Sequence, residues 1–191
     1  KNLDKRLKLY LAVVFVFTLG NSSNAFLLLK AGNAGFDPAS IVLLYFVYNV
    51  VSSVFAVPFG KRSDRIGRKR LLVVGYLTFS LAYAGFAWAP NKTMIVAAFA
   101  LYGIFTAMTA GVERAFVSEI APKELKGTML GLHSTIVGIA LLPASITAGI
   151  LWNIFGSVIP FAFGASLSLV SALMLAFGLP QKAGKGNISV Q

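Results

Sequence analysis

Long apolar stretches, separated by short polar or charged connections, follow one another along almost the whole chain. A helix needs about 20 apolar residues to cross the hydrocarbon core of a bilayer, which is ~30 Å thick. Six stretches are about this long: residues 7–29, 41–59, 71–89, 94–112, 128–152 and 158–179. The pattern predicts an all-α, polytopic membrane protein with six transmembrane helices. Residues 1–180 would form one membrane domain and residues 181–191 a tail.

Basic residues are distributed unevenly over the connections. Fifteen of the seventeen Lys and Arg residues lie before or at the very start of the first stretch, in the second or fourth connection, or in the tail. Only Lys30 and Lys92 lie in the remaining connections. Short loops rich in Lys and Arg stay on the cytoplasmic side of a membrane. We therefore expect an integral protein of the cell (inner) membrane with both termini in the cytoplasm.

Composition supports the membrane class and argues against other classes. The chain is 57% hydrophobic and 12% charged, with a mean hydropathy of +0.79. Its formal charge of +11 does not indicate a nucleic-acid-binding protein, because the bases lie at helix ends and form no patch with interleaved aromatic residues. The absence of Cys excludes disulfides. No enzyme motif, metal-ligand spacing or phosphate-binding loop is found, so we expect no catalytic residue, cofactor or metal, and transport driven by a gradient rather than by ATP.

The connection at residues 60–70 contains one acid and six bases. Its pattern, Gly60-x-x-x-Asp64-Arg65-x-Gly67-Arg68-Lys69, resembles the signature loop of the major facilitator superfamily of transporters, which has Leu where this chain has Arg62. The resemblance implies one six-helix half of a twelve-helix transporter, built from two inverted three-helix repeats. The basic lead-in, the first residue Lys1 and the short tail favour the second half. Whether the chain is part of a longer protein or a complete half that dimerises stays open.

The resemblance also implies a cytoplasmic gate. In this family the aspartate equivalent to Asp64 holds the cytoplasmic side shut, with the help of loop arginines such as Arg65 and Arg68. An acid at the end of the fourth span would pair with these arginines, and Glu113, next to Arg114, is the candidate. The alternative is that Glu113 only neutralises Arg114 at the headgroup level. Gly60 and Gly67 would permit tight turns on either side of the loop.

Strongly polar side chains inside spans are the candidates for a solute cavity, because they are costly in lipid and usually face a bundle interior. They lie on the first, second and fifth spans: Asn21, Asn24, Tyr45, Asn49, Ser52 and His133. Asn49 is as well explained by an interhelical hydrogen bond as by solute binding. The polar run at residues 20–24 is more simply an inward polar face than a local unwinding. His133 could carry a proton, although a single histidine is more often structural.

Small residues recur on the fifth span at helical spacing, at Gly127, Gly131, Ser134 and Gly138. Such a stripe predicts that a neighbouring backbone approaches closely, and Pro143 predicts a bend.

Two function classes follow from the sequence. The first is half of a secondary transporter that moves a small solute by alternating access, with the other six-helix half and the lipid bilayer as its partners; whether protons couple to transport stays open. The second is a six-helix membrane scaffold, sensor or assembly protein that transports nothing.

Overall fold

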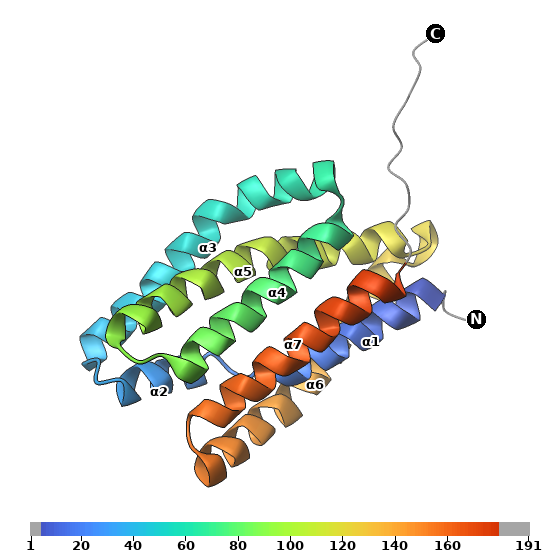
Figure 1. Cartoon of the computed structure of the whole chain (residues 1–191). Helices are drawn as coiled ribbons and strands as arrows, with labels where there is room; N and C mark the ends of the chain where they lie inside the picture. The colour runs from blue at the N-terminus through green and yellow to red at the C-terminus, as the bar shows by residue number, and fades with distance from the viewer. Residues whose placement is uncertain (1–4, 180–191) are drawn as a thin grey trace.

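The computed structural model describes residues 5–179, and these are almost entirely helical (Figure 1). The elements are α1 (Lys5–Gly20), α2 (Ala25–Asn33), α3 (Pro38–Ile66), α4 (Arg68–Trp88), α5 (Lys92–Ile120), the short 3-10 helix η1 (Lys123–Leu125), α6 (Lys126–Phe155) and α7 (Val158–Gly178). Over the described residues they make six spans long and apolar enough to cross a membrane, with α1 and α2 together forming the first. The six-helix prediction is confirmed. The tail predicted at residues 181–191 lies outside the described residues.

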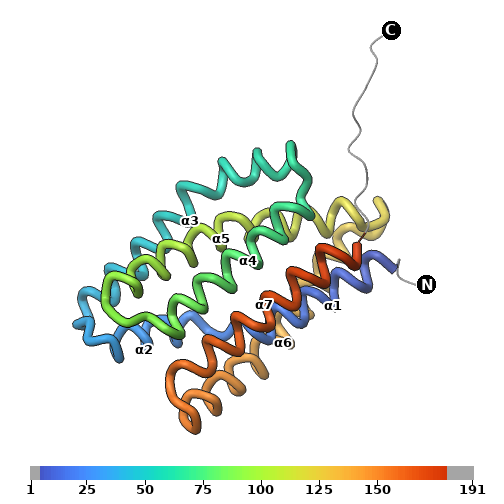
Figure 2. Tube along the Cα trace, in the orientation of Figure 1, coloured from blue at the N-terminus to red at the C-terminus, as the bar shows by residue number. Residues whose placement is uncertain are grey.

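The packing relates the first three spans to the last three (Figure 2). Helix α4 packs along α7 at the centre, α3 and α4 pack against α5, and α6 and α7 pack against α1. If the two triplets are exchanged, the α3–α5 contact becomes the α6–α1 contact and the α4–α5 contact becomes the α7–α1 contact. This correspondence is the arrangement of two related three-helix repeats that the resemblance implied.

Aromatic side chains fill the interior between α1, α4, α5 and α7. The rings of Phe17 and Tyr76 stack with centroids 4.2 Å apart, and Phe79 and Tyr83 stack at 3.9 Å. Phe105 meets Phe79 edge to face at 4.9 Å. Such pairs contribute about 0.5–1.5 kcal/mol beyond the area that they bury. The four helices are therefore joined by one continuous aromatic core.

Glycine permits close approach where α1 crosses α7. A Cβ atom added to Gly164 would clash with the Gly20 carbonyl oxygen and would lie 2.7 Å from the Tyr83 ring. The stripe predicted on the fifth span behaves differently, because no atom lies within 4 Å of a Cβ added to Gly127, Gly131 or Gly138. No described helix approaches that stripe, so its predicted packing is wrong within this chain. Helix α6 continues through Pro143.

Three predicted boundaries also need correction. The first span is interrupted at residues 21–24 instead of carrying the polar run on a continuous helix. The connection at residues 60–70 is helical except at Gly67, whose φ of +93° favours glycine, so Gly60 lies within α3 and makes no turn. Helix α5 extends to Ile120, which places Glu113 about two turns inside the helix rather than at its end.

Candidate functional site

A polar layer lies at mid-height of the bundle, around the break between α1 and α2. The Tyr102 hydroxyl donates a 2.8 Å hydrogen bond to Oδ1 of Asn24, which directly precedes α2. The Tyr102 ring also lies 5.2 Å from the Tyr48 ring, which in turn lies 5.3 Å from the ring of Tyr45. Tyr102 and Tyr48 are each about ten residues, or ~15 Å, from the start of their helices. Asn24 and Tyr45 thus belong to the same polar layer, linked through Tyr102 and Tyr48, and Asn21 lies half-buried in the same break.

The remaining candidates on the second span are Asn49, which is exposed, and Ser52, which is half-buried. Asn49 is exposed and donates a 2.7 Å hydrogen bond to the Tyr45 carbonyl of its own helix. The interhelical hydrogen bond that was one explanation of Asn49 is therefore not made among the described residues. Ser52, one turn further along α3, lines a groove between α3 and α5.

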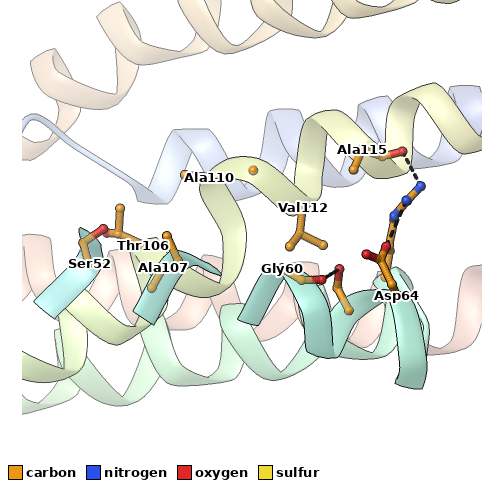
Figure 3. A pocket seen from close by; sticks show the side chains of 12 residues that line it. Ser52, Gly60, Asp64, Thr106, Ala107, Ala110, Val112 and Ala115 are labelled. Carbon is orange, nitrogen blue, oxygen red and sulfur yellow. Dashed lines mark hydrogen bonds and ion pairs between the residues drawn. The ribbon is translucent and has the colours of Figure 1, made fainter. Parts of the chain in front are cut away.

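This α3–α5 groove leads from the middle of the bundle to the end that carries most of the bases, here called the basic end (Figure 3). Its volume is about 330 Å³. Ser52 and Thr106 line it near mid-height, whereas Gly60, Asp64 and Arg68 line it at the basic end. Small side chains of α5 form its floor: Ala107, Ala110, Gly111 and Ala115. The groove joins a predicted cavity residue to the predicted gate.

Arg68 connects three helices at the basic end of the groove. Its guanidinium donates from Nη2 to Asp64 of α3 at 3.1 Å, and from Nη1 to the Ala115 carbonyl and to Glu119 of α5 at 3.0 and 3.2 Å. The planar guanidinium suits several acceptors at once. The acid that the structure places against Arg68 is therefore Glu119 and not Glu113, which corrects the expectation that Glu113 alone was well placed. Arg65 and Arg114 are exposed.

Glu113 instead points into the bundle. Its Oε1 accepts a 3.1 Å hydrogen bond from the Tyr76 hydroxyl of α4, and its Oε2 lies 3.8 Å from Nε2 of His133 on α6. The Tyr10 ring of α1 lies parallel to the His133 imidazole with centroids 6.3 Å apart. Of the Glu113 side chain only 17% is exposed, and of the His133 side chain only 7%. The explanation that Glu113 only neutralises Arg114 at the headgroup level therefore does not describe its surroundings.

Comparison with known proteins agrees with this fold. The family model of the Major Facilitator Superfamily matches residues 9–191. The chain belongs to the Major Facilitator Superfamily. An uncharacterized MFS-type transporter of Methanocaldococcus jannaschii is 39% identical over 183 residues, which cover 93% of this chain and 46% of that protein.

More distant relatives carry names that describe their solutes. A probable polyol transporter of Arabidopsis thaliana is 26% identical over 88% of this chain and 34% of its own length. The galactose-proton symporter of Escherichia coli is 28% identical over 50% of this chain and 21% of its own length. The chain thus spans less than half the length of these relatives. As a member of this superfamily it is an integral membrane protein of the transporter class and not an enzyme.

Four residues of the site were missed in the sequence. Tyr10 and Tyr76 were passed over because a tyrosine ring is largely apolar and does not stand out as a polar residue within an apolar stretch. Glu119 was assigned to a connection, because α5 was predicted to end too early. Tyr102 could have been found from its helical position, since it falls at mid-span like Asn49. Among the described residues, no group of three His, Cys, Asp or Glu side chains could hold a metal ion.

Proposed function

We propose that this chain is one six-helix half of a secondary transporter that moves a small solute by alternating access. The observation that carries the proposal is the uncovered surface of α3 and α6. In the most apolar part of these spans only 11% and 17% of the residues are buried, against 44–56% in the other four spans. A second half packed against α3 and α6 would cover these surfaces and enclose a cavity between the halves.

The polar residues of α3 support this arrangement. Tyr45, Asn49 and Ser52 lie on α3, and Tyr45 and Asn49 are exposed. Polar side chains are costly in hydrocarbon, so a cavity wall suits them better than a lipid-facing surface. The small-residue stripe of α6, at Gly127, Gly131 and Gly138, is likewise free to receive a helix of the other half. The other half would belong to the same polypeptide or to a second copy.

The solute site would lie at the interrupted first span. A break in a transmembrane helix frees backbone groups at membrane depth, which is tolerated where the break lines a cavity. Asn21 and Asn24 supply amides there, and Tyr45, Tyr48 and Tyr102 supply aromatic surface with hydroxyl groups. This combination suits an uncharged or amphipathic solute.

The gate would lie at the basic end, which we place in the cytoplasm of the cell, together with both termini. Arg68 joins Asp64 to Glu119 and so ties the end of α3 to α5. When α3 moves against the other half, these contacts would break and reform. Arg65 is exposed and free to reach the other half. Glu113 and Arg114 lie on the same part of α5, where Glu113 would act through the bundle interior.

The experiment uses the complete natural protein that contains this chain, reconstituted in liposomes. Uptake of labelled galactose, labelled sorbitol and ethidium is measured as a function of concentration. We expect saturable uptake of one of them, strongly reduced by Asp64→Asn. Asp37→Asn is the matched control, because it makes the same chemical change at the opposite end of α3 and an asparagine also caps a helix.

Two results would contradict the proposal. One is saturable uptake that Asp64→Asn leaves unchanged. The other is saturable uptake by residues 1–191 alone, in a species whose measured mass is that of a monomer, since one half cannot enclose a cavity between halves.

A further inference from the structure

Four helices bring polar side chains together about two turns inside the basic end. This buried polar cluster consists of Tyr10 (α1), Tyr76 (α4), Glu113 (α5) and His133 (α6). Along α5, Glu113 lies eleven residues, or ~16 Å, from Tyr102 of the mid-height layer. The cluster is therefore separate from the proposed solute site and from the contacts of Arg68.

The cluster contains an acid and a base that are not yet hydrogen-bonded. The Nε2 atom of His133 is buried and has no hydrogen-bond partner among the described residues, and it faces Oε2 of Glu113 at 3.8 Å. A charge-assisted N–H···O bond is about 2.7–2.9 Å long, so the two atoms are ~1 Å too far apart. The Tyr10 hydroxyl is also buried; it faces the Tyr76 hydroxyl but makes no hydrogen bond of ordinary geometry among the described residues. Unsatisfied polar atoms of this kind are rare in a protein interior and call for an explanation.

We propose that Glu113 and His133 form a proton-binding site, and that the proton bound there is the ion that drives solute movement. The proposal rests on the proposed transport function and adds the coupling ion to it. One imidazole and one carboxylate are the groups that exchange protons near neutral pH. They are too few to hold a metal, which takes at least three protein ligands in the usual zinc sites.

Binding of the proton has a mechanical consequence. A proton taken from water adds to the pair, and the Nε2–H···Oε2 bond that forms draws His133 toward Glu113. On release the proton returns to water, and no other bond changes. Because the two residues belong to α6 and α5, the bond changes the spacing of these helices at the basic end. Helix α6 is largely uncovered, and it also reaches the aromatic core, through Trp152, whose ring centroid lies 6.2 Å from that of Phe161 on α7.

Polar and charged groups from three helices surround the pair. Tyr76 donates to Glu113 from α4, Tyr10 faces His133 from α1, and the nearest charged neighbour along α5 is Arg114, which is exposed. The Tyr76 hydroxyl holds the carboxylate in place while leaving Oε2 directed at the imidazole. Tyr76 is thus a positioning residue for the pair.

The test observes the imidazole directly. The complete natural protein is labelled with ¹³C and ¹⁵N histidine in lipid nanodiscs, and the signal of His133 is identified by its loss in His133→Gln. We expect this signal to titrate with pH, and its midpoint to move by about one pH unit or more in Glu113→Gln, since a charge within ~4 Å has effects of this size. Glu124→Gln is the matched control, because Glu124 is an exposed acid of η1, and it should leave the midpoint in place.

A second variant keeps the test decisive if Glu113→Gln does not fold. Tyr76→Phe removes only a hydroxyl and should also move the midpoint. An unchanged midpoint in every folded variant, or a His133 signal that does not titrate between about pH 4 and about pH 10, would overturn the proposal.

Transport then separates the two proposals. For whichever of galactose, sorbitol or ethidium is taken up, Glu113→Gln should abolish accumulation driven by a pH gradient and preserve exchange of solute across the membrane. If saturable uptake has the same rate with and without a pH gradient, and the same rate in Glu113→Gln, the proton site is refuted and the transport function stands. A linked titration of Glu113 and His133 in a protein that moves no solute would refute the transport function and leave the proton site standing.

Discussion

Helices α3 and α7 have the same mean hydropathy, 2.0 over their most apolar windows, and very different surroundings. In those windows 44% of the residues of α7 are buried, against 11% in α3. Helix α7 lies between α4 and α1, whereas α3 touches mainly α5 and carries a row of exposed apolar side chains, among them Val42, Phe46, Val54 and Val57. Helix α6 resembles α3 in this respect. Hydropathy therefore indicates that both helices belong in a membrane. It does not indicate whether lipid or protein covers them.

The difference divides the molecule into a covered core and two uncovered helices. The core is α1, α4, α5 and α7, where aromatic rings interlock and glycines allow backbones to meet. The uncovered helices carry Asp64 and Arg65 of the proposed gate and His133 of the proposed proton site, whereas Arg68, Glu119 and Glu113 belong to the core helices α4 and α5. In this arrangement the covered core positions Arg68, Glu113 and Glu119, and a large part of the surface of α3 and α6 is left uncovered.

The largest effect is expected where the covered core is tightest. Gly164→Val would force a Cβ atom against the Gly20 carbonyl and the Tyr83 ring, so we expect a loss of about 3 kcal/mol or more, or failure to fold. Gly131→Val on the uncovered face of α6 meets no atom within 4 Å and should cost little in residues 1–191 alone. Melting temperatures of both variants in detergent give the comparison. In the complete protein Gly131→Val should become costly, and a neutral effect there would show that the other half does not cover the stripe.

A second comparison concerns hydrogen bonds. Tyr102→Phe removes the bond to Asn24 that joins α5 to the broken span, and we expect a loss of about 1 kcal/mol. Asn49→Leu removes a bond that Asn49 makes to its own helix on the uncovered side, so its effect on unfolding should be close to zero. Unfolding of both variants in mixed detergent measures the two costs. Equal costs would contradict the distinction between covered and uncovered polar groups.

A third comparison asks which acid pairs with Arg68. In a double-mutant cycle, Arg68→Gln and Glu119→Gln should be coupled by about 0.5–1 kcal/mol, because their side chains are in contact and partly exposed. Arg68→Gln and Glu113→Gln should be additive within ~0.5 kcal/mol. The cycle is measured as unfolding free energy and as transport rate. Coupling of Arg68 to Glu113 alone would restore the pairing predicted from the sequence and contradict the geometry.

The smallest effect is expected at the opposite end of α3. Asp37 caps this helix by accepting from the amides of Ala39 and Ser40, and hydrogen bonds from Ser40 hold the pKa of its carboxyl below the usual range. A lowered pKa means that the stabilisation is present above the pKa of the unfolded chain and is lost as the pH falls through the lower pKa of the folded state. Asp37→Ala should therefore lower the melting temperature slightly near neutral pH and have no effect in strong acid. A difference that persists in strong acid would contradict this origin.

The sequence predicted the spans well because hydropathy is a property of each segment by itself. Its errors occurred where a neighbour decides the conformation. Gly20 begins the break in the first span at the point where α1 meets Gly164 of α7, a contact between residues 144 positions apart. Glu113 was assigned to a helix end because charges usually terminate spans, yet Tyr76 and His133 accommodate it inside the bundle.

The sequence predicted individual residues of the candidate site, but only the structure shows which of these residues lie together. Asn24, Tyr45 and His133 were singled out for their polarity, and this reasoning could not say that the first two lie near Tyr102 while His133 lies with Glu113. The signature loop was identified by its pattern, but the ion pair between Asp64 and Arg68, four residues apart, was not predicted. The partner Glu119 could not be found in this way, because it lies 51 positions further along the chain.

The sequence by itself determined that the chain crosses a membrane six times and which end of the bundle carries the bases, because transfer into hydrocarbon and the placement of charge depend on local composition. Only the tertiary structure decided which helices are covered, which glycines are in contact and which acid meets which base. Those outcomes depend on contacts between segments far apart in the chain. Transmembrane helices pack against one another through complementary shape and interhelical hydrogen bonds, and hydropathy measures neither of these.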